Sequence, residues 1–287
     1  MGRDNDLTSE VKQLALVKGA HLVGIASVDR FEGAPRGHGP SDLLPGARSV
    51  IAIAQRFFQT IINSDTFCTE TELIPKDELW QAQRNIFGFL YATVNLEMQM
   101  IGVQIAHLLS EKGYPTLPIP SSGAAAAHTP EFGSAHYTFF SNRHAAVLAG
   151  LGEFGFNNLL LTPKYGPRVR LDSIITTAEL EPDPMVGNIC LGEKCMLCIQ
   201  DKACFGELHE FKMGGRTMRM ARMKGCKKNL CGRSNPDAPL PYNRACIGPC
   251  PVGMKEGEHL TPRKEFIDQV RMLRKEGKVR DVPSTAS

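Results

Sequence analysis

The sequence predicts a mixed α/β domain followed by a short metal-binding segment. Short apolar runs and helical periodicity alternate over roughly the first 185 residues, and eight of the nine cysteines crowd between positions 190 and 250. With 287 residues, 42% of them hydrophobic and 22% charged, the chain resembles a soluble globular protein of one large or two ordinary domains. We expect an α/β (α+β) domain over 1–185, a cysteine-rich module over 186–258, and a C-terminal helix with a polar tail over 259–287.

No apolar run is long enough to span a membrane, and the first ten residues, MGRDNDLTSE, lack an apolar core and a twin-arginine pair. We therefore expect a cytoplasmic protein with no membrane partner. The net charge of +3 is unevenly distributed, because residues 201–287 hold 18 Lys and Arg against 10 Asp and Glu. This basic third is either a solvated face or a surface for an acidic partner. No RNA-binding motif accompanies it, so tRNA is not expected as a partner.

The first half of the α/β domain shows two strands between helices. Residues 9–18 have the apolar spacing of an amphipathic helix, and the runs 21–26 and 49–54 suit buried strands. Residues 78–112 contain no proline and keep helical periodicity, which predicts one long helix or two abutting ones that end at Gly113.

The second half contains a short helix and a possible hairpin. Residues 115–120 are expected to be extended, and 141–149 helical with Ser141 or Asn142 as the N-cap. The runs 158–162 and 169–177 flank a turn sequence and predict a β-hairpin. A linker at 181–184 then leads to the cysteines, and 261–278 is expected to be a charged helix.

The cysteine-rich segment indicates metal or cluster ligation. Without an export signal, a disulfide framework is not expected, and a segment with so few aliphatic side chains needs a metal centre to stabilise it. Eight thiolates are the number that two four-cysteine centres require. The predicted ligands are Cys190, Cys195, Cys198, Cys204, Cys226, Cys231, Cys246 and Cys250. The remaining Cys68 is interpreted as a small buried hydrophobe.

The spacing suggests how the ligands divide. A Cys-x2-Cys pair at 195/198 serves zinc and iron–sulfur sites alike, whereas a cysteine followed by proline, as at Cys250-Pro251, ends bacterial ferredoxin motifs. In two-cluster ferredoxins that last cysteine serves the other cluster. We therefore expect two [4Fe–4S] clusters, one held by Cys190, Cys195, Cys198 and Cys250 and one by Cys204, Cys226, Cys231 and Cys246. The alternatives are one cluster, zinc, or no metal.

Three further patterns allow more than one interpretation. Residues 150–155 match G-x-G-x-x-G but follow a helix, which favours a tight turn over nicotinamide binding. The polar group His136, Tyr137, Ser141, Arg143 and His144 either supplies a proton donor or consists of satisfied polar residues. The methionines and arginines of 213–223 indicate an apolar helix face or a cover for a cofactor.

Two sequence blocks resemble the corrinoid-dependent reductases, namely the epoxyqueuosine reductases and reductive dehalogenases, over about residues 8–255. The first block comprises Leu22-Val23-Gly24-Ile25-Ala26, Asp29-Arg30-Phe31, Ala34-Pro35, Gly37-His38 and Leu44-Pro45-Gly46-Ala47-Arg48-Ser49-Val50-Ile51. The second comprises Arg143, Ala149-Gly150-Leu151-Gly152, Gly155, Asn157, Leu159-Leu160-Leu161, Tyr165-Gly166 and Ile174-Ile175-Thr176. The cysteine-rich segment follows them, as it does in that family.

This resemblance implies a nitroreductase-like domain that holds base-off cobalamin and a ferredoxin-like module that passes electrons to it. The implied corrinoid contacts are Gly150, Leu151, Gly152, Gly155 and Asn157. The catalytic aspartate of epoxyqueuosine reductases is absent, because its position falls on His136. Reductive dehalogenases use a tyrosine, so Tyr137 or His136 would act as the acid, beside Arg143.

The sequence thus predicts an iron–sulfur, cobalamin-dependent reductase of a small molecule that takes electrons from a low-potential ferredoxin or flavodoxin and could form a homodimer. The missing aspartate and the lack of a helical-repeat extension argue against epoxyqueuosine as the substrate. The missing export signal argues against respiratory dehalogenation. An electron-transfer protein that serves a partner's corrinoid or flavin, and a zinc-stabilised binding module, are the alternative functions.

Overall fold

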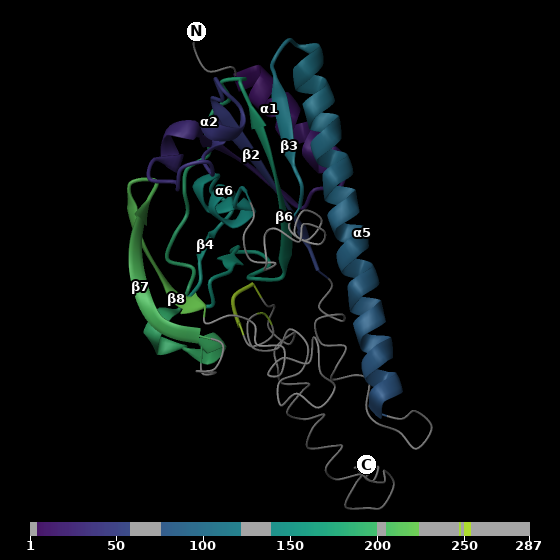
Figure 1. The fold of residues 1–287 in the computed structure, drawn as a ribbon, viewed down its shortest axis with the longest axis vertical. Coiled ribbons are helices and arrows are strands. Elements are labelled where there is room, and N and C mark those ends of the chain that lie inside the picture. Colours follow the sequence, from purple (N-terminus) through teal and green to yellow (C-terminus); the bar gives the residue numbers. More distant parts are fainter. Residues whose placement is uncertain are drawn as a thin grey trace, which may run out of the picture.

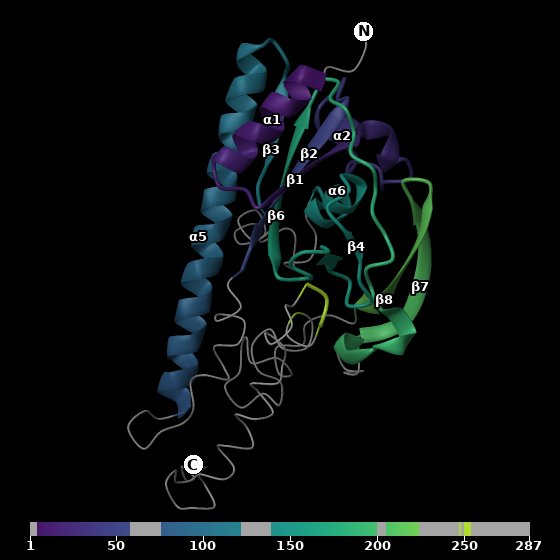
Figure 2. The same ribbon diagram turned by 180° about the vertical axis from the view of Figure 1, so that it is seen from behind.

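The computed structural model describes residues 5–57, 76–121, 139–199, 205–223, 247 and 250–253. They form three layers, with a four-stranded sheet between two layers of helices. Helices α1 (Asn5–Val17) and α5 (Lys76–Glu111) cover one face of the sheet, and helix α6 (Asn142–Leu148) packs on the other (Figure 1). Strands β7 (Phe205–Met213) and β8 (Arg216–Met223) form a separate ribbon on the α6 side, as the reverse view also shows (Figure 2).

The sheet is antiparallel throughout. Its order is β1 (Leu22–Ser27), β2 (Ser49–Arg56), β6 (Val169–Thr176) and β3 (Thr116–Ile119). A second small sheet pairs β4 (Glu153–Phe154) with β5 (Leu160–Leu161). The short helices are η1 (Val28–Phe31), α2 (Pro40–Leu43), η3 (Gly192–Lys194) and η4 (Leu197–Ile199).

Side chains of β2 divide the core into two clusters because successive residues of a strand point to opposite faces. Ile51 and Ile53 pack with residues of α1 and α5, whereas Val50, Ala52 and Ala54 pack with α6. Small residues on the second face let α6 come close. A Cβ placed on Gly24 would collide with the carbonyl oxygen of Ala149, so glycine is required where β1 meets the end of α6.

Most predicted elements of the α/β domain are confirmed. The helix at the N-terminus and the two early strands occur with small shifts of boundary, and the long helix is one continuous element. The segment expected to be extended forms β3. Ser141 is the N-cap of α6 and accepts a hydrogen bond from the backbone N–H of His144. The mixed α/β class is thus correct, and the division into three domains stays a prediction.

Two local predictions were wrong. The runs 158–162 and 169–177 do not pair with each other, because β5 pairs with β4 and β6 lies between β2 and β3. β6 is almost wholly buried because helices α5 and α6 pack against it from the two faces of the sheet, and long-range pairing decided its partners. The methionine segment is the strand β8 instead of a helix. Met218 and Met220 are two residues apart, a spacing that places both on one face of a strand.

Some expectations concern residues outside the described ones. These are the helix 261–278, Cys68, His136 and Tyr137. None of the described helices combines the length and the hydropathy needed to cross a membrane.

A buried carboxyl group lies in the middle of the sheet. Asp172 in β6 is 1% exposed, and its Oδ1 accepts a hydrogen bond of 2.8 Å from the backbone N–H of Ser173. Its side chain faces Gly102 of α5. Burial raises the pKa of Asp172 to about 7, against smaller opposing effects of that N–H and of the charge on Arg170. Folding therefore favours the protonated form of this group.

We expect Asp172→Asn to remove a pH dependence of stability. The native pKa of Asp172 lies above its pKa in the unfolded chain. This group therefore leaves the free energy of unfolding unchanged below about pH 4 and lowers it increasingly between pH 4 and pH 7. The cost is about 1.4 kcal/mol for each pH unit that separates the native pKa from the unfolded one. In urea unfolding at pH 5, 6, 7 and 8, the variant should gain stability over the parent as the pH rises. Glu207→Gln, at an exposed position, is the control. A constant difference between variant and parent would contradict the assignment.

Candidate functional site

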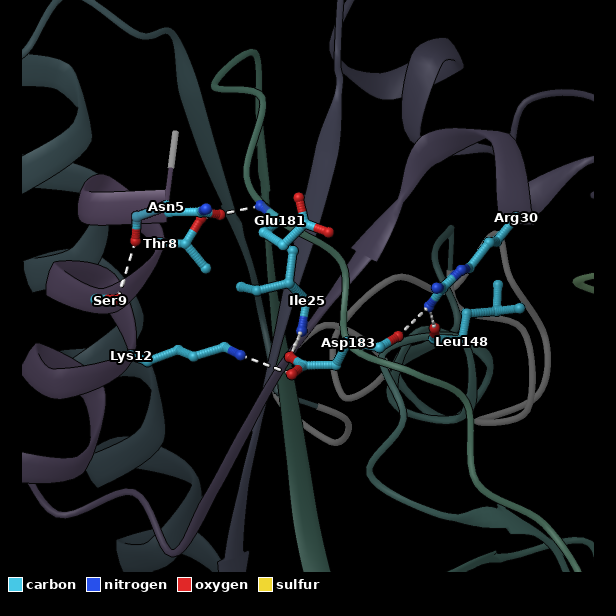
Figure 3. Close-up of polar contacts among 9 residues, drawn as sticks. All are labelled: Asn5, Thr8, Ser9, Lys12, Ile25, Arg30, Leu148, Glu181 and Asp183. Carbon is cyan, nitrogen blue, oxygen red and sulfur yellow. Dashed lines mark hydrogen bonds and ion pairs between the residues drawn. The ribbon is translucent and has the colours of Figure 1, made fainter. Parts of the chain in front are cut away.

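Charged side chains hold the segment that connects the sheet to the cysteines. The carboxylate of Asp183 forms an ion pair of 2.6 Å with Lys12 of α1 and accepts a hydrogen bond of 2.8 Å from the backbone N–H of Ile25 (Figure 3). Arg30 donates to the carbonyl oxygens of Asp183 and Leu148 at 2.7 and 2.6 Å. The predicted linker is therefore fixed to β1, α1 and the last turn of α6.

Residues 185–190, which follow the linker, are held by Arg216 and Glu153. Arg216 of β8 donates to the carbonyl oxygens of Met185 and Val186, at 2.8 and 3.1 Å. The carboxylate of Glu153 then accepts the backbone N–H groups of Asn188, Ile189 and Cys190. The main chain thus reaches the first cysteine with its direction set by ionised side chains.

Four of the eight predicted ligands line one small cavity of about 20 Å³. Cys190, Cys195 and Cys198 come from the loop after the linker, and Cys250 comes from a segment more than fifty residues later. All four are free thiols. Phe156, Asn157, Leu161, Pro251 and Val252 are among the other residues that line the cavity. The arrangement brings together the set Cys190, Cys195, Cys198 and Cys250 that the spacing had suggested for one centre.

Arg168 holds the distant cysteine in place. It is 4% exposed and donates to the carbonyl oxygen of Cys250 at 2.9 Å and to that of Val252. Burial, and then the thiols of Cys250 and Cys190, raise the pKa of Cys198 to about 12, and burial also raises the pKa of Cys250. Burial therefore favours the neutral thiols of Cys198 and Cys250, and a bound cation would be needed to stabilise these two groups as thiolates.

The donor set suits either an iron–sulfur cluster or zinc. In the described part of the chain, no group of three or more Cys, His, Asp or Glu side chains is arranged to hold a metal ion. A volume of 20 Å³ holds about one water-sized atom, so a four-iron cluster would require the partly exposed loop 190–198 to move outward. Cys204, Cys226, Cys231 and Cys246 lie outside the described residues, and the second centre stays a prediction.

The glycine-rich turn after α6 serves close packing. Gly150 has φ +78°, and a Cβ there would collide with the carbonyl oxygen of Pro184. A Cβ on Gly152 would collide with the carbonyl oxygen of Leu161. Among the five predicted corrinoid contacts (Gly150, Leu151, Gly152, Gly155 and Asn157), only Asn157 lines the cysteine cavity. Protein atoms occupy the space beside the glycines, and a corrinoid contact at these residues stays a prediction.

A larger cavity of about 480 Å³ lies between η1, α6 and β7, and its size is typical of a small-molecule site. Its walls are both aromatic and polar. The residues that matter for its chemistry are Phe31, His38, Phe140, Ser141, Arg143, His144, Phe211 and Lys212. Sequence reasoning identified Ser141, Arg143 and His144, but it missed the wall formed by β7 because it assigned no strand there.

Burial lowers the pKa of two residues in this cavity. Arg143 donates to the backbone and side-chain oxygens of Asn158, and burial lowers its pKa. Burial, and then the charge of Arg143, lower the pKa of His144 to about 4. His144 is therefore neutral near pH 7. Its Nδ1 lies 2.6 Å from Ser141 Oγ, and its ring contacts that of Phe154 with centroids 4.8 Å apart.

Comparisons of sequence place short parts of the chain near two kinds of reductase. No family model matches the sequence. A tetrachloroethene reductive dehalogenase of Desulfitobacterium hafniense is 49% identical over 53 residues, which is 18% of this chain and 9% of that protein. An epoxyqueuosine reductase of Listeria monocytogenes is 42% identical over 59 residues, 21% of this chain and 14% of that protein.

Solved structures resemble the chain over a wider range. A reductive dehalogenase whose structure suggests a mechanism for B12-dependent dehalogenation gives a TM-score of 0.50 at 18% identity, covering 95% of this chain and 38% of that one. An epoxyqueuosine reductase solved with an epoxyqueuosine-modified tRNA stem loop gives 0.47 at 18% identity, covering 69% and 51%. The resemblance to this superfamily is confirmed. The chain spans only a small part of the curated relatives and about two fifths to one half of the solved ones.

We expect His144→Gln to flatten the acid limb of the stability profile. The native pKa of His144 lies below that of the unfolded chain, so the group costs nothing above about pH 6.5 and opposes folding increasingly down to pH 4. Each pH unit between the two pKa values corresponds to about 1.4 kcal/mol. In urea unfolding between pH 7 and 4, the variant should gain on the parent as the pH falls. His107→Gln, on the exposed side of α5, should not.

Proposed function

We propose that this chain is an iron–sulfur reductase that acts with cobalamin on a small-molecule substrate. The observation that carries the proposal is the cavity lined by Cys190, Cys195, Cys198 and Cys250. Four cysteine side chains from two segments far apart in sequence line it, and four cysteine sulfurs are the ligand set of a [4Fe–4S] cluster or of a structural zinc ion. The fold likeness to a reductive dehalogenase supports the redox interpretation over a purely structural zinc site.

Each part of the proposed centre has a role for residues of this chain. Cys190, Cys195, Cys198 and Cys250 would hold one [4Fe–4S] cluster, and Cys204, Cys226, Cys231 and Cys246 the second. A cluster, when bound, carries single electrons. Arg168 fixes the segment that contains Cys250, and the apolar side chains of Phe156 and Leu161 keep water from that side of the cavity.

We assign the substrate to the cavity of 480 Å³ beside α6. Its aromatic side chains suit a planar organic molecule, and its wall carries charged residues of both signs, Arg143 and Lys212 together with Glu32. His144, neutral near pH 7, can share a hydrogen bond without adding charge. The acid that protonates the product is assigned to Tyr137 or His136. Electrons would come from a ferredoxin or flavodoxin.

We assign no described residue a step that involves cobalamin or tRNA. The glycines predicted to contact cobalamin are closely packed by other atoms of the chain, so we assign them no step of the reaction. The expectation that tRNA is not a partner has no support from the comparisons, because one similar structure contains a tRNA stem loop. A titration of the protein with tRNA at several salt concentrations would decide whether this chain binds it. Binding through phosphate contacts should weaken steeply as the salt concentration rises.

Metal content after anaerobic reconstitution with iron, sulfide and hydroxocobalamin tests the proposal directly. We expect about 8 Fe per chain from two four-iron clusters, together with about 1 Co. Iron without cobalt would favour an electron-transfer protein that serves a partner's corrinoid or flavin. Zinc with little iron would overturn the redox assignment.

The ligand set is tested by single substitutions. Cys198→Ala or Cys250→Ala should lower the iron content by about four atoms per chain, because each removes a ligand of the same cluster. Cys68→Ala, outside the cysteine-rich segment, is the matched control and should retain the parent's iron. Equal iron in all three variants would contradict the assignment.

A further inference from the structure

One carboxylate binds three consecutive backbone amides just where the cysteine loop begins. Glu153 Oε2 accepts the N–H of Asn188 at 2.9 Å, and Oε1 accepts the N–H of Ile189 at 2.6 Å and that of Cys190. Asn188 has φ +60°, a left-handed conformation that turns the chain around the carboxylate. Three successive N–H groups directed at one anion form a concave anion site made of main chain.

The position of Glu153 connects this loop to the wall of the cysteine cavity. Glu153 belongs to β4, and its backbone pairs with Leu161 of β5, which lines the cavity. Its side chain extends to the backbone of residues 188–190. Within the described part of the chain, its hydrogen bonds go to these backbone amides and to no cation. The carboxylate therefore lies directly against the main chain of the first cysteine.

This arrangement has two consequences for a centre held by Cys190. The main chain of 188–190 is fixed by charge-assisted hydrogen bonds, which are among the stronger ones in proteins. The amide of Cys190 is also committed to the carboxylate, so it is not free to donate to a cluster sulfur. Fewer hydrogen bonds to sulfur and more negative charge nearby both disfavour the reduced state of a cluster.

We propose that Glu153 is a positioning residue that fixes Cys190 toward the cavity and lowers the reduction potential of the centre bound there. The proposal rests on the proposed function for its second part only. The first part concerns the protein's own backbone and can be tested without any metal. Glu153 lies inside the glycine-rich run 150–155, whose glycines pack closely against other parts of the chain.

Amide hydrogen exchange of the metal-free full chain tests the positioning role. Glu153→Ala should accelerate exchange at residues 188–190 by at least about tenfold, since it removes hydrogen bonds to a charged acceptor. Glu153→Gln keeps one carbonyl oxygen and should accelerate exchange less. Alkylation of Cys190 by iodoacetamide should quicken in Glu153→Ala. Unchanged exchange at 188–190 would overturn the proposal.

The reduction potential of the reconstituted full chain tests the electrostatic role. Glu153→Gln should move the potential to a less negative value, while iron content stays at the parent's level. Glu193→Gln is the matched control, because Glu193 lies two residues before Cys195 and pairs with Arg219 at 2.7 Å without contacting these amides. A shift of the same size in the control would overturn the electrostatic part.

The two experiments separate the two proposals. If the parent takes up no iron, the proposed function fails, and the exchange data still decide whether Glu153 fixes the loop. If iron binds normally and exchange at 188–190 does not change, the positioning role fails while the proposed function stands.

Discussion

The ion-paired carboxylate of Asp183 fixes the point at which the chain leaves the sheet for the cysteines. It joins Lys12 of α1 to the backbone of β1, and Arg30 adds the carbonyl oxygens of Asp183 itself and of Leu148. Partly buried charges stabilise a fold only when they are paired and hydrogen-bonded, as these are. Because three separate elements meet at this residue, the direction of the following segment depends on it.

Both cysteine segments are held by contacts of one kind, hydrogen bonds between a charged side chain and main-chain groups. Arg216 holds the carbonyl groups after Asp183, Glu153 holds the amides before Cys190, and Arg168 holds the carbonyl of Cys250. The loop has little apolar surface of its own to bury, so these contacts take the place of a hydrophobic core. They bring the two cysteine segments to one cavity, which all four cysteines line.

The larger cavity has a different origin. It forms because the small residues of β1 and β2 let α6 lie close to the sheet, which places Ser141, Arg143 and His144 at the edge where the β7–β8 ribbon passes. Burial of the imidazole, and then the charge of Arg143, lower the pKa of His144 to about 4. Aromatic rings of Phe154 and Phe211 complete the surroundings of that imidazole.

The sequence by itself determined the strands Leu22–Ser27 and Ser49–Arg56, the long helix and the cap at Ser141, because periodicity and capping are local signals. It predicted Cys190, Cys195, Cys198 and Cys250 as ligands of one centre, and the structure places these four side chains around one cavity. Only the tertiary structure decided the partners of β6, the strand form of the methionine segment, and the roles of Glu153, Arg168 and Asp183. Each of these depends on groups that meet across long stretches of chain, and burial and charge pairing at such distances leave no periodic trace in the sequence.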